Sequence, residues 1–236
     1  MTPTRRAAVA TGVLFFATHV TSVTALALYG PALDDAGFVT GSGSEQSVLT
    51  GAFLEVLLAL TIVGTGVAIF PVVRRYSEGA ALGYGALRTL EAAVIAAGIV
   101  PLLALTTLRD DGVASASDAV APALVSLHDW TFLLGPSFVC ATNTTVLAFA
   151  LLRSGLVARF VPVIGLVGGP LLFASGTAQL FGAVAPLSAV AAVCAVPVFA
   201  WEISLATYLL VKGFRPDALR RLDAREAQGQ PELVAA

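Results

Sequence analysis

A histidine and an aspartate stand next to each other inside a long apolar stretch, in the segment Leu127-His128-Asp129-Trp130. An imidazole or a carboxylate can exchange protons or act as a general acid or base. Transferring an unpaired charge into hydrocarbon costs at least about 2.5–3.5 kcal/mol, so ionisable groups in membrane segments usually face partners inside a bundle. We therefore expect His128 and Asp129 to face a polar pocket between helices.

Other ionisable or amide side chains also interrupt apolar stretches, and their depth can be estimated from a helical rise of about 1.5 Å per residue. An outer cluster is expected on the side away from the N-terminus, and it contains Glu55, His128, Asp129 and Gln179. An inner cluster is expected nearer the N-terminal side, and it contains Arg88, Glu91 and Glu202. His19 lies in the middle of its stretch and could join either cluster.

The inner cluster carries one guanidinium and two carboxyl groups. Two carboxylates near one guanidinium in a medium of low dielectric constant cannot easily both ionise. Arg88 could instead be a structural clamp with Glu91 or Glu202, or could extend its head group to the inner surface. Trp130 could line the outer pocket or anchor the chain at the membrane interface.

The elements that position these groups are transmembrane helices. Of the 236 residues, 57% are hydrophobic and 12% are charged, and the mean hydropathy is +0.89. Soluble domains contain about 25% charged residues, so this chain has too little polar surface for a water-soluble globule. The pattern predicts an all-α, polytopic bundle of six transmembrane helices, with spans at about 7–29, 48–72, 81–106, 122–152, 160–182 and 187–211.

The spans account for a membrane domain over residues 1–212, followed by a polar tail over 213–236 in which 216–226 could form a short helix. Gly135-Pro136 should kink the fourth span, because proline removes a helical hydrogen bond. The first span is longer than a signal peptide's apolar region and contains His19, which favours a retained helix over a cleaved signal. With both termini cytoplasmic, every Lys and Arg except Arg109 lies on or near the inner side, as the positive-inside rule requires.

Cofactor sites are not expected. His19 and His128 could in principle hold a haem, and Glu55, His128 and Asp129 a metal ion. The two histidines, however, sit at different depths. Cys140 and Cys194 lie in apolar stretches without metal or redox spacing and are expected to be core residues. No basic run suits nucleic acid.

Several short segments together are typical of one protein family. They are Gly51-Ala52-Phe53-Leu54-Glu55, Phe70-Pro71 with Arg74-Arg75, Tyr84 with Arg88 and Glu91, His128-Asp129-Trp130-Thr131-Phe132-Leu133-Leu134-Gly135-Pro136, Arg153-Ser154-Gly155-Leu156, Gly168-Gly169-Pro170, Trp201-Glu202 and Lys212-Gly213-Phe214. Between the first span and Phe214 the chain thus resembles the bacterial integral-membrane proteins of domain-of-unknown-function family 4386. The resemblance implies a polytopic protein of the bacterial inner membrane and implies no activity.

Three kinds of function fit these features. The first is a membrane protein that binds or transports a small, partly apolar molecule, with proton exchange at a buried acid. The second is an enzyme that uses a buried carboxylic acid on a lipid or isoprenoid, similar in kind to small membrane terpene cyclases, with Glu55, Asp129 and His128 as catalytic groups. The third is a scaffold that binds a protein partner. The expected pocket residues are His19, Glu55, Arg88, Glu91, His128, Asp129, Trp130, Gln179 and Glu202.

Overall fold

The computed structural model describes residues 1–33, 37–111, 119–186 and 188–227. The expected start of the sixth span at residue 187 and the last part of the tail, 228–236, lie outside these residues. The described elements are α1 Pro3–Leu33, α2 Glu45–Val73, α3 Glu78–Asp110, α4 Val120–Phe132, the π-helix η2 Leu133–Val139, α5 Cys140–Ser154, α6 Phe160–Leu180, α7 Ala189–Val211 and α8 Pro216–Ala227.

The expected all-helical fold with six candidate spans is confirmed, since six helices are long and apolar enough to cross a bilayer, counting α4, η2 and α5 as one. Several of these helices are longer than expected because the apolar pattern marks only their central part. The side chains of Ser44 and Ser77 accept hydrogen bonds from the first turns of α2 and α3. Such caps satisfy backbone N–H groups that have no partner within the helix.

The fourth span changes its helical form around Gly135-Pro136, where the sequence predicts a kink. Pro136 cannot donate a backbone hydrogen bond, and residues 133–139 form a π-helix between α4 and α5. Local π-helical turns occur often at functional sites because they redirect nearby side chains. Here the segment brings Pro136 and Ser137 to the lining of a cavity.

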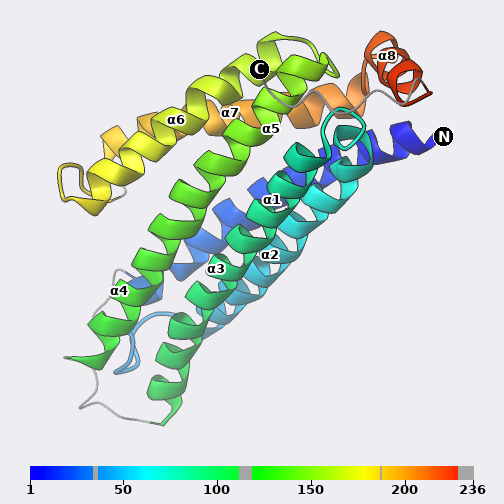
Figure 1. The fold of residues 1–236 in the computed structure, drawn as a ribbon. Helices are drawn as coiled ribbons and strands as arrows, with labels where there is room; N and C mark the ends of the chain where they lie inside the picture. Colours follow the sequence, from blue (N-terminus) through cyan, green and yellow to red (C-terminus); the bar gives the residue numbers. More distant parts are fainter. Residues whose placement is uncertain (34–36, 112–118, 187, 228–236) are drawn as a thin grey trace.

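The helices pack as two groups, α1 to α3 and α5 to α7, which meet where α7 contacts α1 and α5 contacts α3 (Figure 1). In the first group α1 packs on α2 and α2 on α3, and in the second α6 packs between α5 and α7. Contacts between α1 and α7 join the groups, while the far ends of α6 and α7 diverge from α4 (Figure 1). The divergence leaves space between α7, α1 and α4, and two cavities lie there.

Small residues allow the second group to pack closely. A Cβ atom added to Gly165 of α6 would lie 2.7 Å from Trp201 Cδ2 of α7 and 2.9 Å from Ala148 Cβ of α5. Trp201 itself is among the largest fully buried side chains. Helices in membranes associate through such close van der Waals packing rather than through a hydrophobic driving force.

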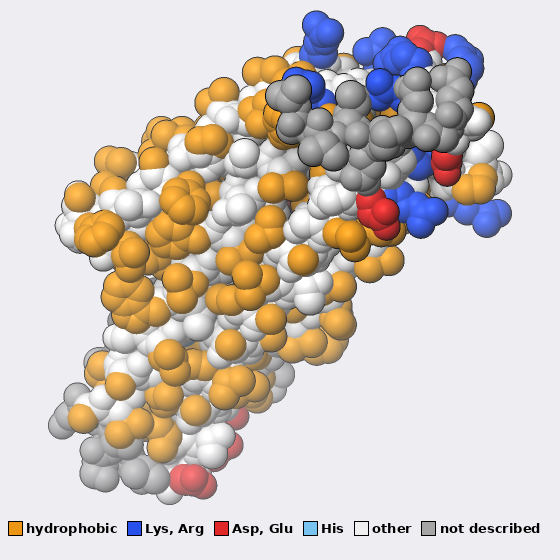
Figure 2. Space-filling view, viewed as in Figure 1, with side chains coloured by type: hydrophobic (Ala, Val, Ile, Leu, Met, Phe, Trp, Pro, Cys, Tyr) orange, Lys and Arg blue, Asp and Glu red, His pale blue; other side chains and the backbone are white. Residues whose placement is uncertain are grey.

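The two ends of the bundle differ in charge, and we call the one that carries the N-terminus and α8 the basic end. Blue Lys and Arg side chains gather there, whereas hydrophobic side chains cover the visible flank of the bundle (Figure 2). α8 is packed against this end, since its Ala218 and Leu222 are buried and the backbone N–H of Arg215 donates to Leu156 O at 2.9 Å. At the opposite end Arg109 donates to the carbonyls of Phe38, Gly41, Ser42 and Gly43.

Candidate functional site

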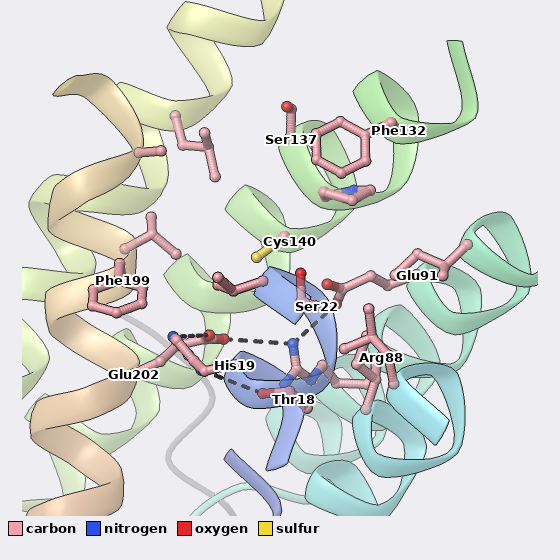
Figure 3. Close-up of a pocket in the computed structure, with 18 residues that line it drawn as sticks. Thr18, His19, Ser22, Arg88, Glu91, Phe132, Ser137, Cys140, Phe199 and Glu202 are labelled. Carbon is pink, nitrogen blue, oxygen red and sulfur yellow. Dashed lines mark hydrogen bonds and ion pairs between the residues drawn. The ribbon is translucent and has the colours of Figure 1, made fainter. Parts of the chain in front are cut away.

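A cavity of about 270 Å³ lies at the junction of the two helix groups, and all six spans contribute to its lining. Most of its wall is apolar, with side chains such as Leu58 and Ile62 of α2, Leu172 of α6 and Val198 of α7. Its acidic and basic side chains are His19 of α1, Arg88 and Glu91 of α3 and Glu202 of α7 (Figure 3). These four side chains form what we call the central site.

Arg88 is the hub of the central site, and its side chain is only 2% exposed. Its Nη1 donates to Glu91 Oε2 at 3.0 Å and lies 3.6 Å from Glu202 Oε1, and its Nε donates to Thr65 Oγ1 at 2.9 Å. The same Oε2 of Glu91 accepts from Asn143 Nδ2 of α5 at 2.6 Å. Hydrogen bonds among α2, α3 and α5 and an ion pair with Glu202 of α7 thus fix the guanidinium and the two carboxyl groups.

Glu202 links Arg88 to His19, whose Nε2 lies 3.5 Å from Glu202 Oε2 (Figure 3). The other ring nitrogen of His19, Nδ1, lies 2.9 Å from the backbone oxygen of Phe15. A backbone oxygen can only accept, so Nδ1 carries the proton of a neutral His19. Nε2 is then the nitrogen that can take up a further proton next to Glu202.

The central site is not fully satisfied by the protein. Among the described residues, Nη2 of Arg88 has no hydrogen-bond partner, nor does the buried hydroxyl of Tyr84, whose ring lies beside the guanidinium. With His19 neutral, the formal charge of one guanidinium and two carboxylates is minus one. Buried polar groups normally have partners and buried charges are normally balanced, so the site has room for water, a proton or a polar group of a ligand.

The cavity extends from the central site to the outer surface of the helix bundle. Val23 of α1 and Phe199 of α7 line it, and these side chains are 62% and 51% exposed. The ring of Phe199 also packs edge-on against His19 at a centroid distance of 4.7 Å. Because this flank of the bundle is apolar, the opening between α1 and α7 faces the acyl chains when the helices span a membrane.

A second cavity of about 280 Å³ contains part of the expected outer cluster: His128, Asp129, Trp130 and Gln179. It lies toward the end opposite the basic end, and it shares Phe132 and Ser137 with the first cavity. Gln179 Nε2 donates to Ser175 Oγ at 3.3 Å. The two cavities thus adjoin at the π-helical segment, with the central site in one and His128 in the other.

The expected outer cluster forms only in part. Glu55 lines neither cavity and accepts a hydrogen bond at 2.8 Å from Tyr29 of α1. His128 is buried, with Nδ1 2.9 Å from Gly98 O and its ring 5.6 Å from that of Tyr29. Asp129 and Trp130 line the second cavity with His128, but their side chains are exposed rather than enclosed between helices. Adjacent helical residues point about 100° apart, so burying His128 turns Asp129 outward.

The arrangement bears on the cofactor alternatives. His19 and His128 line different cavities, which does not suit one haem held by both. Within the described part of the chain, no group of three or more His, Cys, Asp or Glu residues is placed to hold a metal ion. The ionisable groups that do meet are a guanidinium, two carboxyl groups and one imidazole, a set suited to binding a proton or an organic cation.

Some residues of the site have weak signals in the sequence. Thr65 hydrogen-bonds Arg88, but threonines in apolar helices commonly bond their own backbone, as Thr65 also does to Ile62 O. Tyr29 ends an apolar stretch and gives no sign that it will meet Glu55. Asn143 has the clearer signal, since an amide in an apolar span needs a partner, and Glu91 provides it.

Six long apolar helices around a cavity with an ionisable floor define a multi-pass membrane protein. Residues 10–213 match the family described as Domain of unknown function (DUF4386), and the chain belongs to this uncharacterised family. No curated protein and no solved structure matches the chain. The family therefore agrees with the membrane fold, and the function has to be argued from the central site.

Proposed function

We propose that the protein binds a small amphipathic cation from the bilayer at the central site, in exchange for a proton, and transports it or presents it to a partner. The observation that carries the proposal is the cavity itself. Its mouth lies between Val23 and Phe199 on the apolar flank, and its floor is formed by Arg88, Glu91, Glu202 and His19. An apolar wall with a few convergent polar groups is the usual form of a small-molecule site.

The charge of the central site determines the class of ligand. With both carboxylates ionised and His19 neutral, the site has one negative charge in excess, which is costly within a bilayer. A proton on His19 or on one carboxyl group balances the empty site. The cationic head of a ligand balances the occupied site in its place, while its apolar part lies along Leu172, Val198 and Phe199. Binding of a monovalent cation should then release about one proton.

Transport requires that the ligand can leave by a second route, and the second cavity, which contains His128, offers one. Phe132 and Ser137 belong to the lining of both cavities, so a small motion at the π-helical segment would connect them. Asp129, Trp130 and Gln179 would contact the ligand there. We place the protein in the bacterial inner membrane with the basic end in the cytoplasm, following the positive-inside rule.

A second candidate is an enzyme that uses a buried carboxylic acid on a lipid or isoprenoid. It is supported by Glu91 and Glu202 lining an apolar cavity together with Phe132 and Phe199, whose rings could stabilise a cation. The acid pair would differ from Glu55 and Asp129, because Glu55 lines neither cavity. Conversion of an added isoprenoid by the purified protein would favour this candidate.

Three probes with the same alkyl chain test the proposal: octyltrimethylammonium, octanol and octyl sulfate. Binding to the full chain in nanodiscs of zwitterionic lipid would be measured by calorimetry. We expect affinity to decrease in the order cation, alcohol, anion. Glu202→Gln should weaken cation binding about tenfold or more and leave octanol binding unchanged, since it removes one charge from the site.

Glu55→Gln is the matched control, because it neutralises a buried carboxyl group that lines neither cavity. It should change cation binding less than about twofold, because Glu55 would not contact the bound ligand. Equal affinity for the three probes, or equal effects of the two variants, would contradict the proposal.

A further inference from the structure

A third cavity, of about 500 Å³, lies at the basic end and is lined by five arginines. Arg153 lies in the last turn of α5 and Arg159 directly before α6, and Arg215, Arg221 and Arg225 come from α8 and the residue before it. No Asp or Glu belongs to the lining among the described residues. We call it the arginine cavity. An ordinary solvated surface carries charges of both signs, whereas the charged side chains that line this cavity are all positive.

The carboxylates of α8 do not neutralise these arginines. Asp217 pairs with Arg220, and Asp223 and Glu226 pair with Arg75 of the turn after α2. None of the five lining guanidinium groups forms an ion pair with a carboxylate in the part of the chain that the structure describes. The arginine cavity thus holds a positive charge that the described protein leaves unbalanced.

The fold fixes the helix that supplies the arginines. Ala218 and Leu222 of α8 are buried in the core at the basic end, and the N–H of Arg215 donates to Leu156 O. Arg221 and Arg225 are one turn apart, so they share a face of the helix. The packing of α8 therefore brings both guanidinium groups to the same cavity as Arg153 and Arg159.

We propose that the arginine cavity binds phosphate groups, and that the phosphate belongs to an anionic phospholipid of the surrounding leaflet. Guanidinium groups bind phosphate oxygens with paired hydrogen bonds. Basic pockets at the ends of transmembrane helices are suited to anionic lipid head groups. Two exposed phenylalanines, Phe149 and Phe160, lie one turn before Arg153 and next to Arg159. Acyl chains would lie along these rings while the head group occupies the cavity.

The lipid is tested by titrating delipidated full-length protein in detergent with dioleoylphosphatidylglycerol and counting bound lipids by native mass spectrometry. The double variant Arg221→Gln/Arg225→Gln should weaken binding about tenfold or more, since each removes a charge-assisted contact. Arg6→Gln/Arg74→Gln is the matched control, because both arginines are exposed at the same end and outside the cavity. It should change binding less than about twofold. Equal weakening by both double variants would overturn the proposal.

A second titration, with inorganic pyrophosphate, separates the two sources of phosphate. Phe160→Ala should weaken phosphatidylglycerol binding and leave pyrophosphate binding unchanged, because only the lipid has chains that contact the ring. Pyrophosphate binding that depends on Arg221 and Arg225, together with lipid binding that does not, would support the phosphate site and overturn its assignment to a lipid. Failure of both ligands to depend on these arginines would overturn the site itself.

Discussion

Replacing Arg88 should destabilise the protein far more than replacing the carboxyl group of Glu202. Arg88→Met removes the contacts to Glu91 and Glu202 and the hydrogen bond to Thr65. The formal charge of the site changes from minus one to minus two with His19 neutral. Removing one partner of a buried ion pair typically costs about 3–5 kcal/mol, and we expect a loss of this size in the free energy of unfolding.

Glu202→Gln should have a much smaller effect. The amide keeps an oxygen that can accept from Arg88, and the formal charge of the site changes from minus one to zero. We expect a loss below about 1 kcal/mol, near the net value of one hydrogen bond. The difference of at least about 2 kcal/mol between the two variants corresponds to roughly a thirtyfold difference in the unfolding constant.

The two tryptophans make the assay practical. Trp201 is 1% exposed and lies in the core, whereas Trp130 is 51% exposed. In a Trp130→Phe background, the fluorescence of Trp201 reports unfolding as sodium dodecyl sulfate is added to protein in mild detergent micelles. Arg74→Met, at an exposed position, serves as the control and should change stability by less than about 0.5 kcal/mol. Equal losses for Arg88→Met and Glu202→Gln would refute the charge balance derived above.

Three further predictions concern the scaffold and use the same unfolding assay. Gly165→Ala should cost about 1–3 kcal/mol because the new methyl group overlaps α5 and α7, whereas Gly83→Ala, which meets no atom within 4 Å, should be neutral or slightly stabilising. Tyr29→Phe should cost about 1–3 kcal/mol because Glu55 loses its hydrogen bond, and an unchanged stability would contradict that contact. Arg109→Gln should speed proteolysis within residues 37–43, and an unchanged rate would show that its carbonyl contacts do not hold this loop.

The membrane fold could be predicted from the sequence because length and apolar composition determine it. Each span needs about 20 apolar residues, and all six runs exceed this length. The inner cluster could be predicted for a related reason: Arg88, Glu91 and Glu202 lie at similar depth, and hydrocarbon disfavours each of them alone. The structure brings the three together and adds His19, which depth alone left unassigned.

The outer cluster was harder to predict because depth does not determine which way a helix faces. Glu55 and Asp129 have similar depth, yet Glu55 turns to Tyr29 and Asp129 is exposed. The orientation of α4 follows from burying His128 against the carbonyl of Gly98. No pattern in the sequence predicts this contact. The divergence of α6 and α7 from α4, beside which both cavities lie, likewise has no signal in the hydropathy pattern.

Proton release on cation binding tests the proposed role of the central site most directly. Octyltrimethylammonium has no titratable group, so a proton released on binding comes from the protein and is taken up by the buffer. Calorimetry in buffers of different ionisation enthalpy should give about one proton released per bound cation for the native chain and close to none for Glu202→Gln. Cation binding without proton release in the native chain, or the same release from both proteins, would contradict the exchange at Arg88, Glu91, Glu202 and His19.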